Sequence, residues 1–266
     1  MVIRMPTKPH DCAPLLDFAQ KLMDAGVGII AGAKVEIGQE WARNPKVVAL
    51  TLLSRSLSNL KGAVAMVHQN LIVEARTLTR LACENLICLG GLAARGTAFV
   101  NDLVEDEALS RKKKGKLLLE HAEDQNLADV TDTLRGYLAE LERKHPKPKG
   151  LNMRQTAEAS AVRQAYVWYA MLSGDATHVS ATSLNRHLLR EHEGDTIYLR
   201  VDVAPEPQLE EQYDTVEILC TVLLGVCIAT NELLGSTPVG LVLRSMADEL
   251  DILKAMQAPA ELSKAS

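Results

Sequence analysis

Apolar residues recur every three or four positions through most of the chain, the spacing of one face of an α-helix. Ala, Leu, Glu, Lys and Arg, all good helix formers, dominate the same segments. The pattern predicts helices over residues 13–33, 45–69, 71–95, 97–121, 127–144, 152–173, 181–193, 208–234 and 238–256. We therefore expect an all-α fold, a multi-helix bundle of about eight or nine helices.

Two segments depart from the helical pattern. The stretch from Ile197 to Val203 alternates apolar and polar residues, which predicts at most one short strand near residues 196–203. A lone strand must pair with another extended segment or with a second subunit, so a homodimer is one alternative. The turn-rich HPKPKG at 145–150 is the best internal linker in what we predict to be a single helical domain over residues 1–266.

The amino-acid composition does not favour some classes of binding protein, those for nucleic acid and anionic lipid among them. A hydrophobic content of 47% is ample for a core. A net charge of −5 argues against non-specific electrostatic binding of nucleic acid or anionic lipid. Aromatic residues make up only 3%, too few for a base-stacking surface. Nearby acidic residues offset the positive charge of the basic run at 111–116, which is typical of a solvated helix face.

The N-terminal sequence, the most apolar window and the cysteines predict the cellular compartment. The N-terminal MVIRMPTKPHDC lacks the apolar stretch of a secretory signal. The most apolar window, 218–230, is shorter than the roughly 18 to 20 residues that span a bilayer, which predicts a core helix. The five cysteines form no C-x-x-C pair, as in proteins of a reducing compartment. We expect a cytoplasmic protein without a membrane segment.

The helix predicted at 71–95 carries the clearest polar cluster. At 100° per residue, Arg76, Arg80 and Glu84 lie within about 40° of one another, while leucines fill the opposite side. Charges on an apolar, central helix must be paired or line a cavity, because their desolvation is costly. They are either a structural ion pair or guanidinium groups that bind an anion.

A second polar segment follows the aromatic residues 166–169. Ser173, Asp175 and His178 flank the predicted helix end at Gly174, where they cap the helix or line a site. A metal site from His178, His187, Glu191 and His192, or a Ser173–His178–Asp175 nucleophile set, lacks the specific spacings of either chemistry. We predict no metal and no cofactor.

The segment from Arg186 to His192 reads R-x5-H, which resembles the R-x4–6-H signature of the HEPN helical ribonucleases. That resemblance implies that the Arg and the His act on an RNA phosphodiester. The spacing also occurs from Arg4 to His10, and two matches are close to the number expected by chance. On a continuous helix over 181–193, Arg186 and His192 would point about 120° apart, so they would need a kink or a second subunit to converge.

Two segments together resemble one family. EARTLTRLACENLICLGGLAARGTAFVNDL (74–103) is similar to the Arg-x-x-x-Glu helix, and YAMLSGDATHVSATSL (169–184) to the Tyr-x-x-x-Ser…His element, of the all-helical bacterial family known as domain of unknown function 5677. The similarity extends over about residues 50–235. It implies that Arg80, Glu84, Tyr169, Ser173 and His178 belong to one site, and it implies no activity.

The sequence thus leaves two hypotheses of function. In the first, the protein binds a small anionic ligand or a protein partner in a polar pocket formed by Arg76, Arg80, Glu84, Tyr169, Ser173 and His178. In the alternative, Arg186 and His192 serve a HEPN-like, metal-independent ribonuclease, as in phage defence, and nucleic acid is a partner only in that case.

Overall fold

The computed structural model describes residues 11–39, 41–176, 181–194 and 196–257. The elements are α1 (Ala13–Gly32), a 3₁₀ turn (Trp41–Arg43), α2 (Pro45–His68), α3 (Ile72–Arg95), α4 (Thr97–Asp124), α5 (Ala128–Lys144), α6 (Met153–Glu158), α7 (Arg163–Ala176), α8 (Ala181–Asn185), β1 (Leu188–Glu193), β2 (Thr196–Val201), α9 (Leu209–Leu234) and α10 (Val239–Gln257). The described residues thus form ten α-helices and one pair of strands, which confirms the all-α class.

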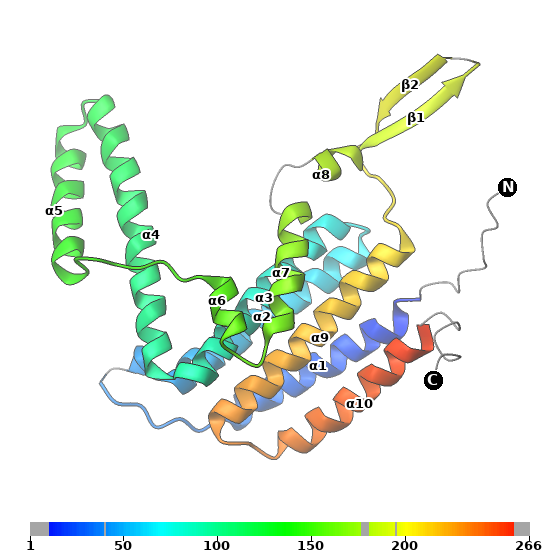
Figure 1. Ribbon diagram of the computed structural model, residues 1–266, viewed down its shortest axis with the longest axis horizontal. Coiled ribbons are helices and arrows are strands. Elements are labelled where there is room, and N and C mark those ends of the chain that lie inside the picture. Colours follow the sequence, from blue (N-terminus) through cyan, green and yellow to red (C-terminus); the bar gives the residue numbers. More distant parts are fainter. Residues whose placement is uncertain (1–10, 40, 177–180, 195, 258–266) are drawn as a thin grey trace.

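The helix α3 lies at the centre of the bundle. It packs against α2 on one side, α9 on another, and α6 and α7 on a third (Figure 1). Leu86, Ile87, Leu89 and Leu92 of this helix are almost or fully buried, and one continuous hydrophobic cluster extends from α1 to α10. The prediction of a central, largely apolar helix over 71–95 is therefore confirmed.

Several helices begin or end where their capping residues in the sequence predict. The side chain of Asn44 accepts a hydrogen bond from the backbone N–H of Lys46 at 2.9 Å and caps α2, and Pro45 takes the first helical position. Gly96, with a φ of +54°, separates α3 from α4 in a backbone conformation that glycine adopts without strain. These ends depend only on neighbouring residues, which is why the sequence predicts them.

The helix predicted over 152–173 is instead two helices, α6 and α7. The turn between them lies directly on Gly90 of α3, where an added Cβ would come within 2.4 Å of Val162 and 2.7 Å of the Ser160 hydroxyl. The Ser160 hydroxyl donates to the carbonyl of Ala157 at 3.0 Å and helps to end α6. The break is therefore fixed by close contact with another helix, which residue periodicity does not reveal.

The prediction of a helix over 181–193 is wrong. Only Ala181–Asn185 is helical, and residues 188–193 form β1, which pairs antiparallel with β2 in the register Leu188 to Val201 through Glu193 to Thr196. The strand expected near 196–203 thus finds its partner in the preceding segment, and Gly194, with a φ of +60°, lies in the turn. Pairing with β2 outweighs the helix propensity of Leu, Arg and Glu in β1.

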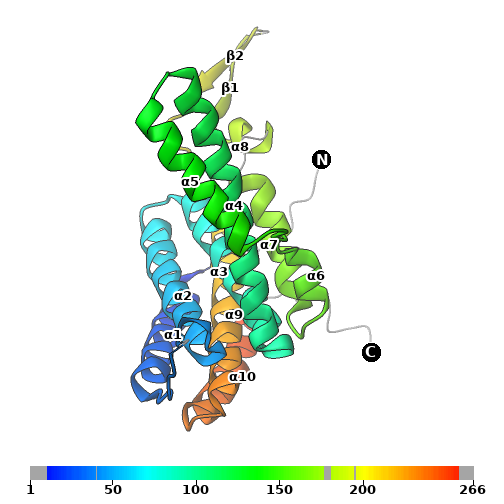
Figure 2. The ribbon, with the colours of Figure 1, turned by 90° about the vertical axis from the view of Figure 1, so that its left-hand side faces the viewer.

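The helices α4 and α5 form a long antiparallel arm that extends away from the bundle (Figures 1 and 2). Ion pairs run along it, among them Lys112 with Glu142 and Arg111 with Glu107. The predicted linker at 145–150 returns from the arm along α4, where the His145 ring contacts Glu105 at 2.8 Å. Just after the linker, the backbone N–H of Leu151 donates to Asp106 at 2.8 Å.

Among the described helices, α9 is the one long and apolar enough to cross a membrane by length and composition. In the bundle it packs against α1, α2, α3 and α10, and Val216, Leu219, Leu223 and Val226 are fully buried there. This burial is the usual property of a core helix, so the membrane-like composition of α9 is weak evidence for a membrane span.

The central position of α3 predicts a large cost for truncating Leu89, whose side chain is fully buried. Leu89→Ala should lower the free energy of unfolding by roughly 2–5 kcal/mol, since it leaves a cavity in the core. The matched substitution Leu118→Ala, at an exposed position of α4, should change it by about 0.5 kcal/mol or less. Urea unfolding measures both, and equal effects of the two changes would contradict the fold.

The cysteines give a second prediction. All five are free thiols, and burial raises the pKa of Cys83, Cys88, Cys220 and Cys227 to about 12. Only the thiolate reacts with a disulfide reagent, so at about pH 8 we expect Cys12, which is partly buried, to react well before the other four in native protein. Full labelling should require unfolding, and rapid labelling of a second thiol in native protein would contradict this burial.

The raised pKa values of these thiols also predict how the free energy of unfolding depends on pH. The folded state keeps these thiols protonated, whereas the unfolded chain releases the protons near the ordinary pKa of 9.0. The free energy of unfolding should therefore be unaffected by them below about pH 9 and fall as the pH rises from there toward 12. Urea unfolding at increasing pH measures this decline.

Candidate functional site

The polar side chains Arg76, Arg80 and Glu84 lie on one face of α3 and are partly buried. The side chains of Arg76 and Arg80 are 16% and 17% exposed, and that of Glu84 is 33% exposed, although the helix around them is packed in the core. They follow one another at a spacing of four residues, so each lies one helical turn above the last. Partly buried guanidinium groups need partners, and apart from Glu84 those partners come from elements distant in the sequence.

Arg80 is held by α7. Its Nε donates to the Ser173 hydroxyl at 2.8 Å, its Nη2 donates to the Tyr169 hydroxyl at 2.8 Å, and its Nη1 lies 3.5 Å from a carboxylate oxygen of Glu84. The guanidinium carbon also lies 4.5 Å from the centre of the Tyr169 ring. The structure thus brings together Arg80, Glu84, Tyr169 and Ser173, four of the five residues that the family resemblance groups in one site.

The α7 side chains are themselves fixed. The Ser173 hydroxyl donates to the carbonyl of Tyr169 at 2.6 Å, one turn earlier in α7, and the Tyr169 ring stacks on that of Tyr166 with centres 5.9 Å apart. Ser173 and Tyr169 lie four residues apart and therefore on the same face of α7, the face that meets α3. This arrangement orients both hydroxyls toward Arg80.

Arg76 points to a residue that the sequence did not single out. Its Nη1 lies 3.2 Å from Glu211, in the first turn of α9, where a negative charge is favoured by the helix dipole. The same carboxylate accepts two hydrogen bonds from Arg186, at 2.7 and 2.5 Å. Glu211 therefore joins α3 and α9 to the base of the strand pair, and no local motif marks it.

The other predicted residues lie apart from this cluster or outside the described part of the chain. His178 and the side chain of Asp175 are outside it. The His187 ring contacts the backbone carbonyl of Asp202 at 2.8 Å, while Glu191 pairs with Arg200 on the strands at 3.0 Å. In the part of the chain that the structure describes, no three His, Cys, Asp or Glu side chains gather as a metal site would require.

Arg186 and His192 do not converge within one chain. Arg186 precedes β1 and is directed to Glu211 of α9, whereas His192 is exposed and pairs with Ile197, next to the turn at the other end of β1. At about 3.3 Å per residue, the length from Leu188 to His192 is roughly 13 Å. The two side chains of the R-x5-H segment therefore belong to different ends of the strand pair.

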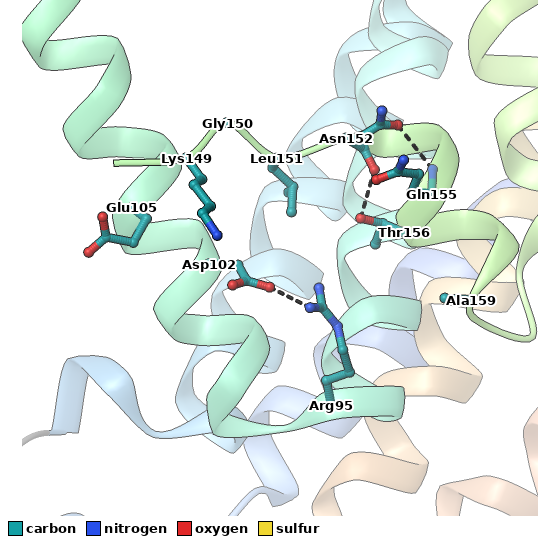
Figure 3. A pocket seen from close by; sticks show the side chains of 10 residues that line it. All are labelled: Arg95, Asp102, Glu105, Lys149, Gly150, Leu151, Asn152, Gln155, Thr156 and Ala159. Atoms are coloured by element: carbon teal, nitrogen blue, oxygen red, sulfur yellow. Dashed lines mark hydrogen bonds and ion pairs between the residues drawn. The ribbon is translucent and has the colours of Figure 1, made fainter. Parts of the chain in front are cut away.

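A separate hollow of about 390 Å³ lies between the end of α3, the start of α4 and the segment 149–159 (Figure 3). An ion pair between Arg95 and Asp102, 2.5 Å apart, crosses its floor, and Lys149 extends toward it from the linker. Its charges are balanced, and none of the residues predicted for the site lines it. The sequence did not indicate this hollow, because its walls come from segments some fifty residues apart.

The shared carboxylate predicts a stability effect. Glu211→Ala removes the common partner of Arg76 and Arg186, and should lower the free energy of unfolding by roughly 1–3 kcal/mol because two partly buried charges lose their ion-pair partner. The control is Glu210→Ala, in the same helical turn but exposed, with an expected change of about 0.5 kcal/mol or less. Chemical denaturation measures both, and equal losses would show that Glu211 does not join these elements.

Comparison with known proteins supplies the family and no activity. No curated protein and no solved structure matches the chain. Residues 46–196 match a family described as a family of unknown function, DUF5677, and the match covers both polar segments, from Arg76 to His192. It ends before residue 235, the limit expected from the sequence, so α9 and its Glu211 lie beyond it. Because more than half of its length matches, the chain belongs to the DUF5677 family.

Proposed function

We propose that the protein binds a small anionic ligand, bearing a carboxylate or a phosphate, at Arg80. The observation that supports this function is the way in which Arg80 is held. Two of its three protein partners are hydroxyl groups, and its single carboxylate partner, Glu84, lies at the long distance of 3.5 Å. Hydroxyl groups fix the direction of a guanidinium group without neutralising its charge.

Hydrogen-bond donors remain at this position for a ligand. Arg80 uses three of the five N–H groups of a guanidinium group for Ser173, Tyr169 and Glu84. The Tyr169 hydroxyl accepts from Arg80, so its own proton is left to donate. Two N–H groups and one O–H group are thus available, the number and type of donors that carboxylate and phosphate oxygens accept.

Burial and rigidity favour binding further. Arg80 is only 17% exposed, so an anion that reaches it is attracted more strongly than it would be in open water. Arg76, one turn earlier on α3, lies on the same face but is paired with Glu211, so the proposed binding depends on Arg80. Since Ser173 and the Tyr169 ring already hold Arg80 in place, little side-chain freedom is lost on binding.

Ligand-dependent stabilisation tests this function. Inorganic phosphate and succinate should each raise the melting temperature of the wild-type protein above its value in chloride of the same ionic strength, because a ligand that binds only the folded state stabilises it. Tyr169→Phe, which removes one O–H donor, should weaken the binding by roughly 2- to 10-fold. Arg80→Lys should abolish it, since an ammonium group does not reproduce the guanidinium fork.

The matched control for Arg80→Lys is Arg135→Lys, on the distant helix α5, where Arg135 pairs with Glu123 on the surface. This variant should bind phosphate as the wild type does. Titration calorimetry with the same two anions measures the affinities. If neither anion stabilises the wild-type protein, or if Arg80→Lys binds both unchanged, Arg80 is a structural residue only and the proposed function is wrong.

A further inference from the structure

The strand pair β1–β2 projects from the helical bundle and has two different faces (Figure 1). On one face lie the β2 side chains of Ile197, Leu199 and Val201, which are 59%, 64% and 68% exposed. The opposite face carries the ion pair between Glu191 and Arg200. On the face that carries the three apolar side chains, β1 contributes an arginine and a histidine, so the apolar row belongs to β2. An exposed apolar row of this kind indicates a contact with another molecule.

The backbone of β2 offers hydrogen bonds along its outer edge. The backbone N–H of Asp202 donates to the carbonyl of His187 at 2.8 Å, which makes this pair a hydrogen-bonded one. Hydrogen-bonded and non-hydrogen-bonded pairs alternate along an antiparallel ladder. In the register of the strands, the N–H and C=O groups of Val201, Leu199 and Ile197 therefore point outward, away from β1.

The two edges of the hairpin differ in charge. The β1 edge carries Arg190, Glu191, His192 and Glu193 in succession, and charged residues of this kind are a common protection of an edge strand. Antiparallel pairing of β1 with a copy of itself about Glu191 would place Glu191 opposite Glu191 and Arg190 opposite His192. The β2 edge, TIYLRV, has a single charge, on Arg200.

We propose that β2 pairs antiparallel with β2 of a second copy of this chain, centred on Leu199. In this register Ile197 of each copy lies opposite Val201 of the other, and all outward-pointing backbone groups of the two strands meet in about six hydrogen bonds. Tyr198 of each copy lies opposite Arg200 of the other, so that aromatic rings meet cations and no like charges face each other. The result is a four-stranded sheet across a two-fold axis.

The bundle supports the hairpin in this role. Its base is anchored by Arg186 to Glu211 and closed by the contact of the His187 ring with the carbonyl of Asp202. Within the described residues the sheet has two strands, and a two-stranded hairpin is only marginally stable by itself. A sheet of four strands shared by two copies pairs the free backbone groups of the β2 edge and brings the two apolar rows side by side on one face. The inference is independent of anion binding at Arg80.

Mass in solution tests the dimer. Multi-angle light scattering should give twice the 29.0 kDa of the chain for the wild-type protein at micromolar concentration. Leu199→Lys places two ammonium groups opposite each other at the two-fold axis and should return the mass to that of one chain. The control Glu193→Lys, on the exposed β1 edge, should remain a dimer. A monomeric wild type, or a Leu199→Lys variant that stays dimeric, overturns the proposal.

Cross-linking adds a positive test of the register. Cα atoms of a hydrogen-bonded antiparallel pair lie about 5.5 Å apart, so two thiols at this position are within reach of a short bismaleimide cross-linker. In a Cys12→Ser background, Leu199→Cys should therefore give a covalent dimer with this reagent, while Glu193→Cys should stay monomeric on a denaturing gel. Equal cross-linking of both variants, or none of Leu199→Cys, shows that the two β2 strands do not meet at Leu199.

Discussion

A helix buried on most of its sides has to satisfy every charge that it carries, and α3 carries two arginine residues within its buried length. Leaving either guanidinium group unpaired would cost several kcal/mol. The partners of Arg76 and Arg80 come from α7, from the start of α9 and from α3 itself. The positions of α7 and α9 on the bundle are therefore tied to two charges as well as to the apolar contacts around them.

The two arginine residues meet this constraint differently. Arg76 faces Glu211, a carboxylate that also binds Arg186, and this ion network joins α3, α9 and the strand pair. Arg80 is oriented by the hydroxyls of Ser173 and Tyr169, and its carboxylate partner Glu84 lies farther away, at 3.5 Å. An ion network of the first kind is typical of a structural joint, whereas an oriented and incompletely neutralised cation is typical of a binding site.

The α4–α5 arm and the strand pair, which extend from the bundle, differ in whether they are connected to the charged residues of α3. The first turn of α4 is still buried in the core at Phe99 and Val100, and the α4–α5 arm beyond it is held together by ion pairs of its own, such as Lys112 with Glu142. The strand pair, in contrast, is connected through Arg186 to the charged residues on α3 and α9. Its β1 edge carries four charged or ionisable residues in succession, whereas its β2 edge carries a single charge.

The helical class, the central helix, most helix ends and the placement of Arg76, Arg80 and Glu84 on one face could all be predicted from the amino-acid sequence. These features depend on a repeat of 3.6 residues and on caps such as Asn44 and Gly96, which act over a few neighbouring positions. The similarity to the family added Tyr169 and Ser173, which geometry alone did not connect with Arg80.

The remaining features depend on tertiary packing. It broke the helix over 152–173, because the turn after α6 packs on Gly90, and it turned residues 188–193 into a strand, because β2 offers them a hydrogen-bonding partner. It selected Glu211 as the partner of two arginine residues and separated Arg186 from His192. Each of these outcomes is a contact between segments distant in the chain, and the energy of such a contact has no counterpart in the local pattern of residues.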